Sequence, residues 1–111
     1  MAVAGKGYVV VGADTRMSLG YSIMTRDQPK VTQLTDHCLI ATAGMQADRQ
    51  GFHQLIWARA REYELDHGHP MSVQAVSQLV STQLYYRRFF PYGHLTHSLT
   101  RLLVYIQLVH L

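Results

Sequence analysis

The chain has 111 residues, of which 48% are hydrophobic and 15% are charged, and its net charge is +3. This length fits at most one domain, and the hydrophobic content excludes an intrinsically disordered protein. Arg87 and Arg88 are the only adjacent basic pair, so no nucleic-acid partner is expected. The single cysteine, Cys38, excludes an internal disulfide and fits a reducing compartment.

No membrane segment is expected either. The first seven residues lack the apolar core of a signal peptide. Residues 102–111 are strongly apolar but reach only half of the roughly 20 residues that a spanning helix needs. We therefore expect a soluble, intracellular protein.

Four short strands are predicted in the first part of the chain. Residues 8–11 are rich in valine and flanked by glycines, which is typical of a buried strand. A turn at Gly20 and a short extended piece over residues 21–24 follow, and Pro29 interrupts the chain. Residues 30–34 form a half-buried strand, and residues 38–43 form another, which buries Cys38 and stops at Gly44.

After Gly44 the apolar period changes from two to 3.6, which predicts an amphipathic helix over residues 48–66 with Asp48 as its N-cap. Its polar faces are expected to carry Arg49, Arg59, Arg61 and Glu62, and residues 67–70 end it. A second helix is predicted from Ser72, as its cap, to about residue 88. The apolar faces of the two helices are Phe52, Leu55, Ile56, Ala60 and Tyr63, and Val73, Val76, Leu79, Val80 and Leu84.

Strands followed by two helices predict an α+β fold with both helices on one face of a sheet, whose other face needs a second layer. Residues 93–111 suit a helical face and a strand equally well, so periodicity leaves their structure open.

Three residues stand at the ends of apolar runs, where a strand delivers a polar group to a sheet edge: Asp14, Lys30 and Gly44. A lysine beside an aspartate can lower the pKa of a nearby nucleophile, and a glycine at a strand-to-helix junction offers an oxyanion-hole N–H. Alternatively, Asp14 caps a turn, Lys30 pairs with an acid and Gly44 permits a bend. Spacing alone favours these structural roles.

The order of the motifs resembles the proteasome β-type subunits of the N-terminal-nucleophile hydrolase family. In that family an "AD(S/T)R" turn, a lysine before a "KV" strand and an "AG…AD" junction recur in this order. The corresponding segments here are residues 13–16, 29–31 and 43–48. Residues 14–36 and 87–92 are the most specific matches, and the resemblance covers about residues 2–92.

The resemblance implies that Asp14, Lys30 and Gly44 occupy the positions of the catalytic aspartate, the catalytic lysine and the oxyanion-hole glycine. In active subunits the nucleophile is a threonine at the mature N-terminus, whereas this chain opens with Met1, and its early threonines are internal. The family member that the long matches resemble most is itself understood as non-catalytic. We therefore expect no enzymatic activity, with Asp14 and Lys30 as a buried ion pair and Gly44 as a hinge.

The family's αββα sandwich would continue after Tyr92 with glycine-rich strands and further helices, a pattern that the sequence after this point lacks. We therefore expect residues 1–92 to be a partial proteasome β-subunit domain, its first half, truncated after about Tyr92. Residues 93–111 are expected to form a divergent C-terminal tail.

No metal or cofactor is expected. His67 and His69 flank a glycine in a turn, and His94 and His97 could share a helical face, but no carboxylate or cysteine completes a ligand set. The aromatic and basic run over residues 85–90 fits packing or a subunit contact better than base stacking.

The predicted function is that of a non-catalytic structural β subunit of the 20S proteasome core, or a truncated form of one, in ubiquitin-dependent protein degradation. Its expected partners are the other α and β subunits, in the cytoplasm and nucleus. Two alternatives stay open. One is an active threonine-type endopeptidase subunit whose N-terminal threonine is missing from the sequence, and the other is an unassembled interaction fragment.

Overall fold

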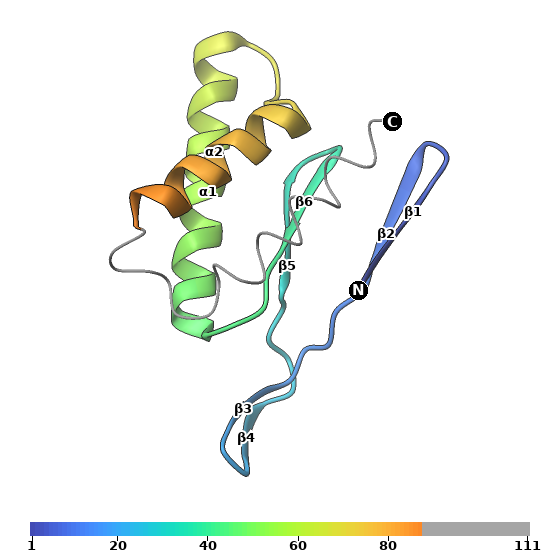
Figure 1. Cartoon of the computed structure of the whole chain (residues 1–111), viewed down its shortest axis with the longest axis vertical. Coiled ribbons are helices and arrows are strands. Elements are labelled where there is room, and N and C mark those ends of the chain that lie inside the picture. Colours follow the sequence, from blue (N-terminus) through green and yellow to red (C-terminus); the bar gives the residue numbers. More distant parts are fainter. Residues whose placement is uncertain (88–111) are drawn as a thin grey trace.

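The computed structural model describes residues 1–87, which form three antiparallel hairpins followed by two helices (Figure 1). The strands are β1 (Ala2–Gly5), β2 (Tyr8–Val11), β3 (Met17–Leu19), β4 (Ser22–Thr25), β5 (Val31–Thr35) and β6 (Cys38–Ala41). The helices are α1 (Gln46–His67) and α2 (Val73–Tyr86). The predicted α+β class is confirmed. The prediction of four strands in one sheet is wrong, because the described residues form six strands in three separate two-stranded sheets.

The first hairpin contains a strand that the sequence did not reveal. β1 is built from alanine, valine and glycine, and the small residues carry little strand signal. Val3 lies opposite Val10, and the ring of Tyr8 lies so close over Gly5 that a side chain there would collide with it. The prediction that residues 8–11 are buried is wrong for Tyr8 and Val10, each 61% exposed, because no other described helix or strand packs extensively against this hairpin.

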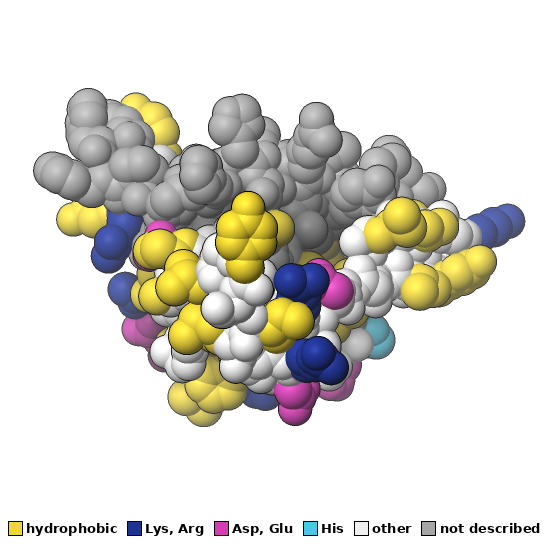
Figure 2. All heavy atoms as spheres, turned by 90° about the horizontal axis from the view of Figure 1, so that it is seen from below, with side chains coloured by type: hydrophobic (Ala, Val, Ile, Leu, Met, Phe, Trp, Pro, Cys, Tyr) yellow, Lys and Arg dark blue, Asp and Glu magenta, His cyan; other side chains and the backbone are white. Residues whose placement is uncertain are grey.

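The second hairpin turns at Gly20, as predicted, with a positive φ of 59° that glycine adopts without strain. A bulge between Met17 and Ser18 shifts the register of β3 against β4. Several large hydrophobic side chains of this hairpin are exposed, including Leu19 and Tyr21. Hydrophobic side chains therefore lie open to solvent on the molecular face shown in Figure 2.

The third hairpin and the two helices share the hydrophobic core. The core residues are Leu34, Cys38 and Ile40 from the hairpin, Phe52 and Ile56 from α1, and Val76 and Val80 from α2. Met71, Val73, Leu79 and Leu84 pack around them, which confirms the predicted apolar face of α2. Burial raises the pKa of the Cys38 thiol, so this cysteine behaves as a small hydrophobe, as expected.

The helix ends show where cap prediction worked. Asp48 is not the N-cap of α1, since Met45 holds that position without a side-chain cap and Asp48 lies in the first turn. At the other end Gly68 is left-handed, with φ of 73°, and its N–H donates to Glu64 O at 2.8 Å. Ser72 caps α2 as predicted, its Oγ accepting from Ala75 N–H at 3.2 Å.

Neither helix within residues 1–87 combines the length and the apolar character that crossing a membrane requires. The predictions for residues 93–111, including His94 and His97, lie outside the described residues.

Candidate functional site

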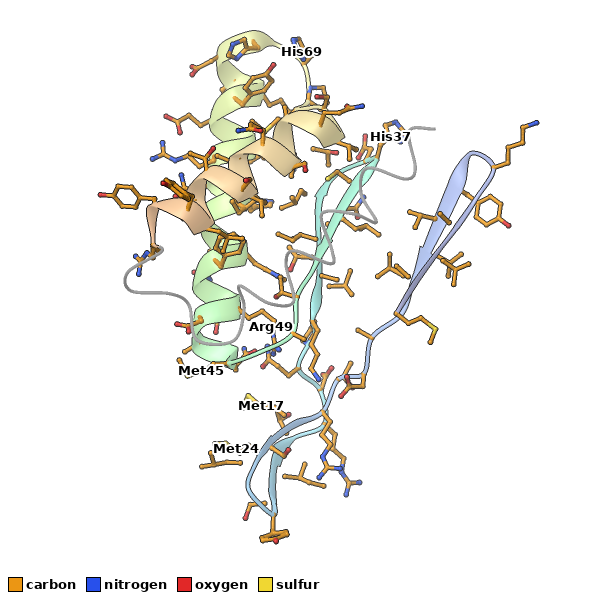
Figure 3. The ribbon with its side chains drawn as sticks, in the orientation of Figure 1. Met17, Met24, His37, Met45, Arg49 and His69 are labelled. Atoms are coloured by element: carbon orange, nitrogen blue, oxygen red, sulfur yellow. The ribbon has the colours of Figure 1, made fainter. Side chains whose placement is uncertain are left out.

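An open cleft of about 700 Å³ lies where three parts of the chain meet: the connection from β2 into β3, the end of β6 and the start of α1. Asp14, Lys30 and Gly44 all line it, so the structure brings the three predicted site residues together. Figure 3 shows Met17 and Met24 of the second hairpin on one side of this region, and Met45 and Arg49 at the start of α1 on the other.

An ion pair joins two of the predicted residues. Lys30 Nζ donates to Asp14 Oδ2 at 2.8 Å. This hydrogen bond is the main cause that lowers the pKa of the Asp14 carboxyl group, and the positive charge of Lys30 adds to it. The predicted buried ion pair is only half correct, because the Lys30 side chain is 18% exposed and that of Asp14 is 69% exposed.

Gly44 has the structural role that its position predicted. Its φ of 134° is one that residues with a side chain rarely adopt, and it lies in the short connection between β6 and α1. Because Met45 supplies no side-chain cap, the first N–H groups of α1 have no side-chain acceptor there. Gly44, Met45 and Gln46 line the cleft beside Lys30.

Arg49 contradicts the prediction that it occupies a polar face of the helix. Only 4% of it is exposed, and its Nη2 donates to Gln46 Oε1 one turn earlier. Burial lowers the pKa of the Arg49 guanidinium, and the negative charge of Asp14 acts in the opposite direction. Arg49 therefore places a second cation, and a buried one, near the Asp14–Lys30 pair.

The sequence analysis also missed His53, which connects α1 to the third hairpin. Its Nδ1 lies 2.8 Å from Thr32 Oγ1 on β5, and its Nε2 lies 2.8 Å from Thr42 Oγ1 just beyond β6. Burial, together with the smaller effect of the positive charge of Arg49, lowers the His53 pKa to about 4. His53 is thus a neutral, hydrogen-bonded side chain inside the fold.

The contact between Thr42 and His53 has the form of a hydroxyl paired with a base. Its surroundings do not activate the hydroxyl, however. No carboxylate among the described residues bonds to the ring, since its second nitrogen meets Thr32, and a pKa near 4 makes the imidazole a weak base. Thr42 is only 7% exposed. This pair therefore positions α1 on the hairpin.

His67 and His69, which the sequence analysis considered as metal ligands, lie at the opposite end of α1 and take no part in the cleft. Across residues 1–87, no three His, Cys, Asp or Glu side chains come together as a metal-binding group.

The model of the proteasome subunit family matches residues 1–98. The chain belongs to the proteasome subunit family. Its N-terminal-nucleophile hydrolase assignment is thereby confirmed. Proteasome subunit beta type-1 is 50% identical over 93 residues in Dictyostelium discoideum, and 48% and 41% identical over 92 residues in Oryza sativa and Danio rerio.

Each of these matches covers 83% of this chain but only 39% to 42% of the relative. The chain therefore spans about two fifths of the length of these relatives. The predicted boundary between residues 1–92 and 93–111 stays a prediction, and the family match reaches six residues past it, to residue 98.

Proposed function

We propose that this chain is a structural, non-catalytic β subunit of the 20S proteasome core, or a shortened form of one, acting in protein degradation in the cytoplasm and nucleus. The observation that carries the proposal is its identity of 37% to 50% to subunits named proteasome subunit beta type-1. Its partners would then be the other α and β subunits of the core.

The geometry of the cleft supports the non-catalytic part of the proposal. The Lys30 ammonium donates to a carboxylate, and the buried Thr42 hydroxyl bonds to the weakly basic His53. Gly44 lets the chain turn between β6 and α1, and Arg49 is buried where α1 packs. Each contact has a structural purpose, namely joining the β2–β3 connection, the third hairpin and α1.

Assembly is the direct test. The 111-residue chain, tagged and expressed in cells, is expected to co-purify with intact 20S core particles and to be recovered in both cytoplasmic and nuclear fractions. Ile56→Asp is the matched control, since Ile56 is fully buried and an unpaired charge there prevents folding. Recovery of the unsubstituted chain only as monomer or aggregate, away from the core, would refute the assembly proposal in favour of an unassembled fragment.

The alternative, an active threonine-type endopeptidase, predicts a different result. A longer form with a mapped N-terminus would begin with threonine and would add peptidase activity to the reconstituted particle. If the subunit is structural, the reconstituted particle should have its full set of peptidase activities, and none of them should come from this subunit.

A further inference from the structure

Two histidines lie at the end of α1, remote from the cleft. His67 is the last residue of α1 and His69 follows two residues later, whereas Arg49 lies near the first turn, about 27 Å away along the helix axis. Figure 3 shows His69 and Arg49 at opposite ends of this helix. The left-handed Gly68 reverses the chain between the two histidines, and their ring centroids lie 6.1 Å apart.

The hydrogen bonds of the two rings fix which nitrogen carries the proton. His67 Nδ1 lies 3.0 Å from Tyr63 O, and His69 Nδ1 lies 3.1 Å from Pro70 O. A carbonyl oxygen can only accept, so each Nδ1 is the donor, and the lone pair of each neutral ring is on Nε2. Histidines that bind metals are oriented in this way, with the other nitrogen donating to a carbonyl or carboxylate.

Tyr63 holds both rings in place. It stacks on His67, with centroids 4.1 Å apart and planes inclined by 16°, and it meets His69 edge-on at 5.6 Å. Side chains restrained in this way lose little rotamer freedom when they bind a ligand.

The separation of the rings fits one ion between them. A metal–nitrogen bond of about 2.0–2.1 Å places the ion roughly 3.2 Å from the centre of each ring. Two rings on one ion then lie about 5 Å apart at a tetrahedral angle and about 6.4 Å apart on opposite sides. The observed 6.1 Å is closer to the second value, so the two nitrogens would lie on nearly opposite sides of the ion. The negative end of the α1 dipole also favours a cation here.

We propose that His67 and His69 bind one divalent transition-metal ion, of the class of Cu²⁺ or Zn²⁺, through their two Nε2 atoms at the C-terminal end of α1. Imidazole nitrogen suits these ions. The described residues hold no group of three such side chains, so the site has two protein ligands and water would complete the coordination. The proposal does not depend on assembly of this chain with proteasome subunits, because both histidine ligands come from this chain.

Calorimetric titration of the purified 111-residue chain with Cu²⁺, in the presence of glycine as a weak competitor, tests the proposal. We expect one ion per chain at this site, with at least tenfold weaker binding in His67→Asn and in His69→Asn. His37→Asn is the matched control, because His37 is an exposed histidine in the turn between β5 and β6 and its loss should leave the affinity unchanged.

A second pair of variants tests the positioning of the rings. Tyr63→Phe keeps the stacked ring and should retain full affinity, whereas Tyr63→Ala removes it and should weaken binding several-fold with the stoichiometry unchanged. Copper binding that persists in both single histidine variants would overturn the proposal. So would binding that is lost only when His94 and His97 are replaced by Asn, or the absence of any binding by the unsubstituted chain.

Discussion

At the scale of single residues, the most consequential side chain is His53. It bonds to threonines that lie on either side of the third hairpin's turn, and only 7% of it is exposed. Its native pKa of about 4 lies below the value of about 6.5 that an unfolded histidine has. Between these two values the unfolded chain binds the proton more readily, so stability must decrease as the pH falls through this interval.

We therefore expect the free energy of unfolding, measured with urea, to decrease as the pH falls from 7 to 4.5, and to flatten below the native pKa. The two pKa values differ by about 2.5 units, which sets the limit of the effect at about 3 kcal/mol. His53→Gln keeps a donor and an acceptor but does not titrate, so its stability should depend less on pH in this range. Equal slopes for both proteins would show that His53 does not couple folding to pH.

Helical spacing alone would have predicted that His53 and Arg49 are buried, but their polar side chains argued against burial. The two residues lie at helical spacing from Phe52, Ile56 and Ala60 and therefore on the buried stripe of α1. Arg49 was assigned to a polar face by its charge alone. Asp14, Lys30 and Gly44 were predictable because each stands at one end of an apolar run, Lys30 before it and the other two after it. The high exposure of Asp14 instead depends on how far the neighbouring hairpins cover it.

At the scale of elements, one glycine inside α1 and one at its C-cap lie in opposite environments. Gly51 lies inside the helix, where an added methyl group would meet nothing within 4 Å, and Gly68 adopts a φ of +73° at the C-cap. Alanine strengthens a helix interior but is strained in the left-handed region.

Gly51→Ala should therefore raise the free energy of unfolding by about 0.5–1 kcal/mol, and Gly68→Ala should lower it by about 1 kcal/mol. Urea denaturation of the two variants beside the original chain measures both changes. The two substitutions add the same methyl group, so each is the control for the other. Changes of the same sign in both would contradict the assigned backbone conformations.

Elements were predictable where local pattern determines them. The helices followed from the 3.6-residue period, and Ser72 and Gly68 marked their ends. The separation of the strands into unconnected hairpins was not predictable, because alternation within a strand does not say whether strands of different hairpins lie side by side. The cap of α1 was missed since Met45 has no polar atom to signal it.

At the scale of the whole molecule, the first hairpin leaves an unusual apolar surface. Val3, Tyr8 and Val10 are 59% to 61% exposed on neighbouring strands, and no other described element packs extensively against them. An isolated two-stranded hairpin is marginally stable in water, and exposed apolar surface promotes association.

Val10→Lys should therefore reduce both the binding of a hydrophobic dye and light scattering by the chain, with little change in unfolding free energy. Dye fluorescence and light scattering at matched concentrations provide the measurement. Val80→Lys places the same charge in the core, where only 2% of the residue is exposed, and should unfold the protein and increase dye binding. Unchanged scattering in Val10→Lys would show that the hairpin face does not drive association.

The division of the described strands into three separate sheets also determines which backbone amides become exposed to solvent together. The amides of β1 and β2 need only the opening of their own hairpin to exchange with solvent deuterium, because no third strand within residues 1–87 extends their sheet. The amides around Phe52 and Val80 belong to the shared core and exchange only when that core opens. Deuterium uptake over time should therefore divide residues 1–87 into a rapidly labelled N-terminal part and a slowly labelled unit of helices and third hairpin.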